Sequence, residues 1–485
     1  MNIRNLKIGI IHSIVGKNDG VSIVIDQTVT AMMEHMDIAL GNFYFLAAYA
    51  PPRFNTALDE IFWHKNDVNR LAVKYFSDPF PPPGIDSALA GGALRTKMVI
   101  EQWIKENEID LIIAHNTSHP YNFTTAVGLG ALIEELRGRD ISWPKCLVWW
   151  HDSFYERPAF LNPGPAVEKY LKYIPGAHND GIIFINSKQP GLAKTYLAKY
   201  TPELDVEKYI KLRTAVIPNT CDIQWDWKSD SWDSEKLIYP PLQQYNSTFF
   251  RDCGLDEIIK NRSLDPDAAV FLLQHTRIVP RKRIDIAIDF AFRLSARFRS
   301  ANQKRFIVLL FSGHSGDEQA SHLEFLQEHY RKRSGENPLD EVIIVYGEKC
   351  ILSSKDIIVD RKFYDFSEIP SVIAARGGMG TYFSEIEGFG NNLLEMVKSA
   401  LPVIINEYEI YESDIKKYGF NFPSVKNCSI TDESVEESFK LLTDIRYRNS
   451  VVKHNLQILE RELSHKVIAE NLEGIVSRII MMDSV

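Results

Sequence analysis

Residues 384–404 have the sequence SEIEGFGNNLLEMVKSALPVI, and this stretch predicts the architecture around it. An apolar run at residues 381–383 ends in a loop with Gly388 and Gly390, residues at helical spacing follow, and a second apolar run begins at Val403. This order is typical of a strand, a loop, a helix and a parallel strand. The loop offers backbone N–H groups at a helix N-terminus, where an anion such as a diphosphate is favoured.

The rest of the chain repeats this alternation of short apolar runs with longer segments of helical periodicity. Such a pattern predicts parallel strands joined by crossover helices, and we expect two doubly wound, Rossmann-like α/β domains facing a cleft. The expected strands are residues 7–11, 43–48, 111–114, 146–150, 181–185 and 214–217, then 270–274, 306–311, 342–346, 381–383 and 403–406.

The same pattern predicts the domain boundaries. We expect an N-terminal domain at residues 1–222, an inter-domain linker rich in Trp and Pro at 223–262, and a C-terminal domain at 263–450. Residues 451–485 have apolar positions at helical spacing. They predict one or two helices with an interruption at Ser464, and leave open whether these helices cross back to the first domain.

Composition excludes several classes of protein. The 485 residues carry 55 Lys and Arg against 64 Asp and Glu, a net charge of -9 that argues against general nucleic-acid binding. No window approaches the roughly 18 to 20 apolar residues that cross a bilayer, and the N-terminal apolar run is too short for a signal peptide. We therefore expect a cytoplasmic protein, without a strong signal for membrane contact.

The sequence predicts no metal site. The Asp265-Pro266-Asp267 triplet precedes a strand, whereas a metal-binding D-x-D would follow one, so we interpret it as a turn. The cysteines form no CxxC pair, which indicates neither a zinc site nor a redox dithiol, and their odd number suits a reducing compartment. They are Cys146, Cys221, Cys253, Cys350 and Cys428.

A second charged motif, QHTRIVPRKR at residues 274–283, follows the expected strand 270–274. Arg277 and Lys282 would lie at the carboxyl end of that strand, where two cations can clamp a diphosphate and stabilise its charge as it leaves. Glu387 on its loop and Glu395 on the following helix can accept hydrogen bonds from sugar or ribose hydroxyls. By spacing alone, both glutamates are equally well explained as solvated residues at a helix start.

Together the motifs resemble those of the retaining GT-B glycosyltransferases of family 4. That family has a G-R-L-x-x-x-K-G element, matched in spacing by Arg277 and Lys282, and an E-x7-E element, matched by Glu387 and Glu395. The stretch VIPNTCD at residues 216–222 extends the resemblance, which covers most of the chain. Three positions depart from it by replacing a family glycine, and these are Thr276, Arg283 and Ala400.

The resemblance implies an enzyme, a hexosyltransferase with an acceptor domain followed by a donor domain. It implies that Arg277 and Lys282 hold the leaving diphosphate, Glu387 the sugar and Glu395 the ribose, without an obligatory metal or other cofactor. The residues it implies for nucleotide-sugar binding are Gly20, Arg277, Lys282, Glu387, Phe389, Gly390, Asn391, Asn392 and Glu395.

The first domain has candidate residues after two expected strands. The family places a His-Asp pair where His151-Asp152 follows residues 146–150, so the resemblance implies that His151 approaches the transferred sugar and that Asp152 orients its ring. We expect acceptor contacts from the loop after residues 111–114, at His115, Asn116 and Tyr121. A capped turn explains that loop equally well.

The acceptor stays open at the level of sequence. A faint similarity of the N-terminal residues to enzymes of compatible-solute synthesis favours a small soluble acceptor such as a glucosyl-phosphoglycerate. Alternatives are a lipid or polysaccharide acceptor, a nucleotide-sugar epimerase or hydrolase on the same fold, and a non-catalytic sugar-nucleotide-binding subunit. Donor base, UDP or GDP, donor sugar and oligomeric state are undetermined by the residues.

Overall fold

The structure is a computed structural model that describes residues 3–17, 19–52, 55–78, 80, 84–174, 176, 178–228, 248–313, 320–351 and 364–482. The chain folds into two compact units. The first comprises Met1–Thr220 together with His465–Val485, and the second comprises Cys221–Ser464.

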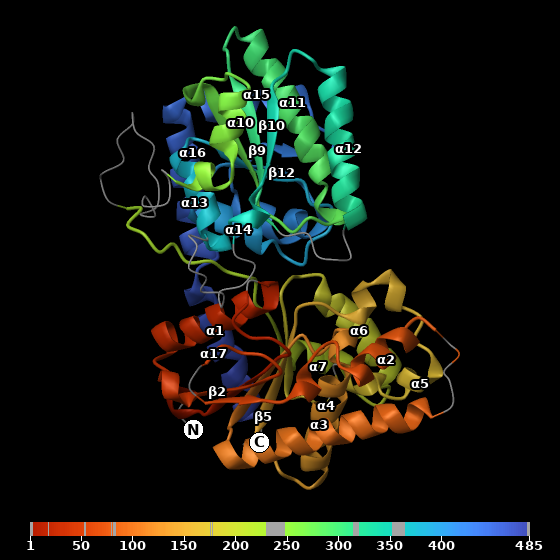
Figure 1. The fold of residues 1–485 in the computed structure, drawn as a ribbon. Coiled ribbons are helices and arrows are strands. Elements are labelled where there is room, and N and C mark those ends of the chain that lie inside the picture. Colours follow the sequence, from red (N-terminus) through yellow and green to blue (C-terminus); the bar gives the residue numbers. More distant parts are fainter. Residues whose placement is uncertain are drawn as a thin grey trace. The chain divides into compact units, whose positions relative to one another are not determined.

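The first unit is built on a seven-stranded parallel sheet of order β3-β2-β1-β4-β5-β6-β7. Its central strands are buried along their whole length, as expected for a parallel sheet covered by helices on both faces (Figure 1). The strands are β1 (Ile8–Ile11), β2 (Phe43–Ala47), β3 (Thr56–Leu58), β4 (Leu111–His115), β5 (Lys145–Trp150), β6 (Gly181–Phe184) and β7 (Thr214–Val216). The helices are α1 (Gly20–Met36), α2 (Asp67–Tyr75), α3 (Ile85–Asn107), α4 (Phe123–Gly138), α5 (Pro165–Glu168), α6 (Gln189–Tyr200), α7 (Val206–Arg213) and α17 (His465–Met481).

The second unit has a six-stranded parallel sheet of order β10-β9-β8-β11-β12-β13. Its strands are β8 (Ala269–Gln274), β9 (Phe306–Phe311), β10 (Val342–Tyr346), β11 (Met379–Tyr382), β12 (Val403–Asn406) and β13 (Ser424–Val425). Its helices are α9 (Phe249–Asp252), α10 (Leu255–Asn261), α11 (Ile284–Ser300), α12 (Ala320–Glu336), α13 (Ile369–Ala375), α14 (Asn391–Lys398), α15 (Asp432–Thr443) and α16 (Ile445–Glu462). All eleven expected strands form within one or two residues of the predicted bounds, and the two additional strands, β3 and β13, are short edge strands.

The two C-terminal helices belong to different units. α16 ends at Glu462 in the second unit and α17 begins at His465 in the first, so the predicted interruption at Ser464 is confirmed. The apolar face of α17, with Ile468, Leu472 and Ile475, is fully buried in the core that contains α1, and Figure 1 shows the two helices together. The segment predicted at residues 451–485 is therefore divided between the units.

Part of the predicted linker, residues 223–262, forms helices. α9 and α10 lie within it. On α10, Leu255 and Ile259 are one helical turn apart and bury their side chains in the core of the second unit. Trp227 is buried beside Val452 and Leu456, close to the start of the same segment. Residues 229–247 of the linker lie outside the described residues.

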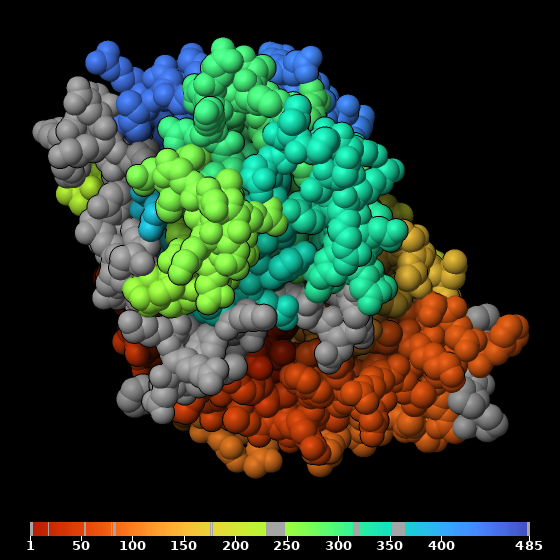
Figure 2. Space-filling model, turned by 45° about the horizontal axis from the view of Figure 1, so that its top comes forward, coloured from red at the N-terminus to blue at the C-terminus, as the bar shows by residue number. Residues whose placement is uncertain are grey.

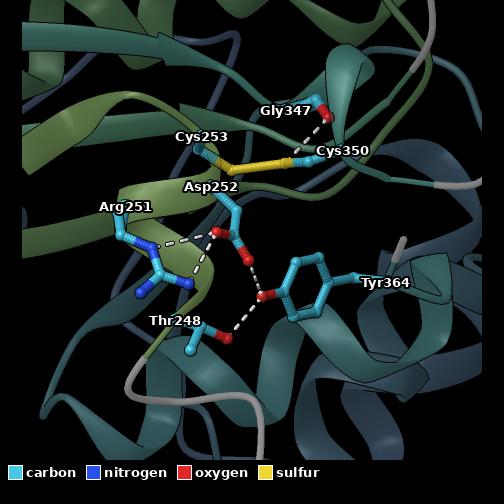
Figure 3. Close-up of a disulfide and its surroundings, with 7 residues drawn as sticks. All are labelled: Thr248, Arg251, Asp252, Cys253, Gly347, Cys350 and Tyr364. Atoms are coloured by element: carbon cyan, nitrogen blue, oxygen red, sulfur yellow. Dashed lines mark hydrogen bonds and ion pairs between the residues drawn. A yellow bond between two sulfur atoms is a disulfide. The ribbon is translucent and has the colours of Figure 1, made fainter. Parts of the chain in front are cut away.

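A disulfide joins Cys253, which follows α9, to Cys350 (Figure 3). No sequence motif indicates this pair, because cysteines 97 positions apart form no local pattern. Beside it, the Tyr364 hydroxyl donates to Asp252 Oδ2 at 2.6 Å and lies 2.8 Å from Thr248 Oγ1. The second unit is thus cross-linked between α9 and the end of β10.

The Asp265-Pro266-Asp267 triplet forms the predicted turn, in which Asp265 Oδ1 accepts from the Asp267 backbone N–H at 3.1 Å. Among the described residues, no helix combines the length and the apolar character needed to cross a membrane.

Candidate active site

The two charged motifs of the second unit meet at one edge of its sheet. β8 and β11 are neighbouring parallel strands, with Gln274 paired to Thr381, so the loops that follow them leave the sheet on the same side. Main-chain contacts join these loops: the Glu385 N–H donates to Arg281 O at 2.9 Å, and Arg281 Nη1 donates to Ile386 O at 2.6 Å. Motifs about 100 residues apart in sequence thus form a single structure.

Lys282 and Glu387 form an ion pair at the centre of this structure. Their side chains are only 6% and 9% exposed, and Glu387 Oε1 also accepts from the Tyr382 hydroxyl at 2.8 Å. Arg281 Nη1 contacts the other carboxylate oxygen at 3.3 Å. Burial would raise the pKa of Glu387, but Lys282 and Arg281 outweigh it and hold that pKa below its usual value. Glu387 is therefore an ionised acceptor that is held rigidly.

Arg277 lies on the outer side of the same loop, where its side chain is exposed. Burial lowers the pKa of Lys282, Glu387 opposes this effect, and the charges of Arg281 and Arg277 lower the pKa further. The loop therefore carries the buried Lys282 within electrostatic reach of the exposed Arg277 and the partly exposed Arg281.

The loop before α14 packs closely against a tyrosine. Gly390, which precedes α14, has φ 129°, and a Cβ there would lie 2.5 Å from the Tyr408 hydroxyl. That hydroxyl donates to Phe389 O at 2.6 Å. The Phe389 ring is buried in the core, so only its backbone can face a ligand. Asn391 and Asn392 are the first two residues of α14.

Glu395, on the second turn of α14, contacts a residue that the sequence interpretation did not select. Its Oε2 lies 3.2 Å from Nε2 of His275, which is fully buried immediately after β8. Asn392 Nδ2 donates to the backbone O of His275 at 2.6 Å. The sequence feature that could have indicated His275 is its position directly after a strand, two residues before Arg277.

Two of the three departures from the family glycines have a left-handed backbone. Arg283 has φ 46° and Ala400 has φ 59°, a region in which glycine is favoured, whereas Thr276 has no positive φ. Arg283 is held there by Asp285 at 2.8 Å and by an ion pair with Glu385. Arg283 and Ala400 therefore keep the left-handed backbone that a glycine would favour at these positions.

Three histidines lie side by side at the carboxyl edge of the first unit's sheet. His12, His115 and His151 stand at the ends of the adjacent strands β1, β4 and β5, and all three are buried. His12 Nδ1 donates to His115 O at 3.1 Å, and His115 Nδ1 lies 3.0 Å from His151 Nε2. The rings of His115 and His151 also stack on Trp149. His151 is thus fixed by a second histidine.

The loop after β4 carries buried polar atoms whose partners are missing among the described residues. They are His115 Nε2, Asn116 Oδ1, Thr117 Oγ1 and Ser118 Oγ. Because buried polar groups are normally hydrogen-bonded, four such atoms on consecutive residues suit a polar ligand. Tyr121, at 36% exposure, stacks on His119 with ring centroids 5.3 Å apart.

Asp152 was expected to contact the His151 ring, but it does not. Its carboxylate instead binds Arg157 through two guanidinium nitrogens, with Arg157 Nε 2.9 Å from Oδ2. Gly20 is exposed as the first residue of α1, whose N-terminus is capped by Asp19 Oδ1 accepting from Val21 N and Ser22 N at 3.1 Å. Neither observation tests the ligand role predicted for His151 or Gly20.

Two histidines of the first unit, His151 and His119, give the protein's stability a predicted pH dependence. Burial lowers the pKa of His151 to about 3 and that of His119 to about 4. Since imidazoles in the unfolded chain have a pKa of about 6.5, the unfolded state binds protons first as the pH falls. We expect the melting temperature to decrease by roughly 5 to 10 °C between pH 6.5 and pH 4.

Scanning calorimetry of His119→Asn checks this prediction. Asn keeps an acceptor for the Tyr121 N–H that His119 Nδ1 accepts at 3.3 Å, but it does not titrate. The variant should show a shallower decrease than the parent, whereas His35→Asn, at an exposed site on α1, should not. Parallel curves for parent and His119→Asn would contradict the prediction.

Two surface pockets of the second unit lie away from all these residues. One, of about 330 Å³, lies between α11 and the end of α12, and its charged side chains are already paired, Asp289 with Arg333 and Arg293 with Asp432. The other, of about 420 Å³, lies between α10 and α12, which Figure 2 shows at the surface in light green and turquoise. Neither pocket contains a predicted site residue.

No family model matches the chain. It is similar to two proteins named mannosylglucosylglycerate synthase. It is 28% identical to that of Thermotoga maritima over 268 residues, which are 51% of this chain and 57% of the relative. It is 25% identical to that of Petrotoga mobilis over 455 residues, which are 87% of this chain and 86% of the relative.

Among solved structures, Anabaena Alr3699/HepE in complex with UDP and glucose matches with a TM-score of 0.54 at 13% identity. The match covers 98% of this chain and 100% of that chain. The two parallel-sheet units thus have the predicted two-domain GT-B fold. Together, the relatives and the fold make the chain an enzyme that transfers a glycosyl group.

Proposed function

We propose that the chain is a retaining family 4 glycosyltransferase that moves a hexose from a nucleoside diphosphate sugar to a hydroxyl of a glucosylglycerate. The observation that carries this proposal is the buried Lys282–Glu387 pair, which joins the two motif loops at one sheet edge. The shared name of the two relatives describes a mannosyl unit on a glucosylglycerate, and it supports mannose as the hexose and an acceptor without phosphate.

In the proposed reaction, the second unit binds the donor. Arg277, Lys282 and the N-terminus of α14 stabilise the negative charge that moves onto the leaving diphosphate oxygen. Glu387 accepts hydrogen bonds from the sugar hydroxyls, and Glu395 accepts them from the ribose. A metal is not required in this proposal, because the two cations supply the positive charge.

His151 would face the sugar in its neutral form. Burial lowers its pKa to about 3, so the imidazole is uncharged at neutral pH. An uncharged ring does not repel the positive charge that develops on an oxocarbenium-like sugar, and it can still hydrogen-bond a hydroxyl. Attack then occurs on the face that the diphosphate leaves, and the departing phosphate oxygen accepts the proton of the acceptor hydroxyl.

A screen of purified protein tests the function. GDP-mannose, GDP-glucose, UDP-glucose and UDP-galactose would each be incubated with glucosylglycerate, glucosyl-phosphoglycerate or no acceptor, and released nucleoside diphosphate measured. We expect release that requires glucosylglycerate and is fastest with a mannosyl donor. Release without acceptor would indicate a hydrolase instead, and conversion of the donor to an isomer would indicate an epimerase.

Two measurements on the product extend the test. Proton NMR of the new glycosidic bond should show the anomeric configuration of the donor, and an inverted product would contradict the retaining mechanism. Activity should be unchanged after treatment with a chelator, and a loss that Mn²⁺ or Mg²⁺ restores would contradict the metal-independent role of Arg277 and Lys282.

A further inference from the structure

His275 contacts three separate segments of the second unit although it has no exposed surface. Its Nδ1 lies 2.9 Å from Ser312 Oγ, directly after β9, and its Nε2 lies 3.2 Å from Glu395 Oε2. The ring stacks on Phe366 with centroids 3.9 Å apart. Its backbone O accepts from Asn392 Nδ2. Every polar atom of the imidazole ring is therefore engaged.

The hydrogen-bond network determines whether Nε2, the ring nitrogen that faces Glu395, carries a proton. The Ser312 hydroxyl lies 2.9 Å from His275 Nδ1 and 3.3 Å from Gln274 O, so it can donate to either atom. The Glu395 carboxylate is an acceptor, and the nitrogen facing it must therefore be a donor. In the neutral ring this tautomer satisfies both contacts, and in the charged ring both nitrogens are donors. Nε2 carries the proton toward Glu395 in either form.

This contact is a hydrogen bond to a charged group in a buried setting. The Glu395 side chain is only 9% exposed, and such bonds contribute more than neutral ones because water competes little for either partner. Loss of the His275 donor would remove the contact that fixes Glu395 Oε2. With the donor in place, one carboxylate oxygen has a defined position relative to α14.

We propose that His275 is a positioning residue that holds Glu395 in the orientation required to bind the nucleotide ribose, and so determines discrimination between ribonucleotide and deoxyribonucleotide donors. The proposal rests on the proposed function, because Glu395 is the ribose contact there. A carboxylate binds hydroxyl groups well only when its oxygens are correctly oriented, so loss of orientation reduces the difference between donors with and without the 2′-hydroxyl.

The test compares kcat/KM for the best nucleoside diphosphate hexose with that for its 2′-deoxyribonucleoside counterpart. We expect the parent enzyme to prefer the ribonucleotide about 10- to 100-fold, the range of one hydrogen bond to a charged group. In His275→Leu the preference should fall below about threefold, through a higher KM for the ribonucleotide, with kcat largely kept. His275→Gln, which retains an N–H donor, should recover part of the preference.

Matched variants separate orientation from general damage to the fold. The Asn392 bond uses the main chain of His275 and is retained in every variant. Ser312→Ala removes the Nδ1 partner and the hydroxyl bond to Gln274 O but keeps the contact between His275 and Glu395, so it should reduce the preference less than His275→Leu. It also tests the network if His275→Leu fails to fold. His35→Asn, at an exposed histidine of the first unit, should leave the preference unchanged.

The outcomes distinguish this proposal from the proposed function. A parent-like preference in both His275→Leu and Ser312→Ala, or a parent enzyme without any preference, would overturn the role of His275. If no donor supports transfer, calorimetric binding of a nucleoside diphosphate and of its 2′-deoxy form to the same proteins measures the same ratio. A ratio that decreases in His275→Leu would then support the positioning role even though the transferase function had failed.

Discussion

Lys282→Ala is expected to lower kcat/KM for the nucleotide sugar by about 100- to 1,000-fold, the effect of losing one preorganised group that stabilises leaving-group charge. Lys282 is the buried cation of the candidate donor site, with its ammonium paired to Glu387. Its loss removes charge from the leaving diphosphate and also releases the Glu387 carboxylate. Steady-state kinetics with a saturating acceptor measures the effect.

A matched control and a double variant make the interpretation specific. Lys260→Ala changes an exposed lysine on α10 and should leave kcat/KM within about twofold, the usual result for a surface site. Lys282→Met combined with Glu387→Gln removes both charges, so it should recover stability lost in Lys282→Met alone without recovering activity. Activity of Lys282→Ala within threefold of the parent would exclude Lys282 from the reaction.

Gly313→Ala is expected to reduce kcat/KM by roughly 100-fold, because displacement of a catalytic group by about 1 Å can cost that much. A Cβ at residue 313 would lie 1.8 Å from Thr276 O, 2.5 Å from the Thr276 carbonyl carbon and 2.9 Å from Arg277 Cα. These are main-chain atoms, which cannot rotate away, so the loop that carries Arg277 must move.

Gly335 provides the matched control for this prediction. A Cβ at Gly335, near the end of α12, meets no atom within 4 Å, and Gly335→Ala should therefore keep the parent's activity and melting temperature or raise the latter slightly. Kinetics and thermal unfolding of both variants would be measured together. Parent-like kinetics in Gly313→Ala would show that the position of the Arg277 loop is not critical.

The fold was predictable because its strands are buried on both faces. A central strand of a parallel sheet has to be apolar at every position, and such runs are visible in the sequence, as at Phe306–Phe311. β3 and β13 were missed because they are edge strands of three and two residues whose side chains are mostly half-exposed. Their formation depends on a neighbouring strand already in place.

The partners of the site residues were less predictable. Spacing located Arg277, Lys282, Glu387 and Glu395, but it could not show that Lys282 pairs with Glu387 or that Glu395 contacts His275. The same limit explains Asp152, which the resemblance assigned to His151 and which binds Arg157 instead. Each of these contacts depends on side-chain directions across separate loops or within a tight turn.

The sequence by itself determined the two doubly wound sheets and the positions of the charged motifs at strand ends, because burial and backbone periodicity act over a few neighbouring residues. Only the tertiary structure decided the charged pair, the histidine beside Glu395, the close approach at Gly313 and the disulfide. These features join residues about 40 to 120 positions apart. The disulfide links the end of α9 to the segment after β10, and the other features exist because adjacent parallel strands bring their carboxyl ends together wherever the strands lie in the sequence.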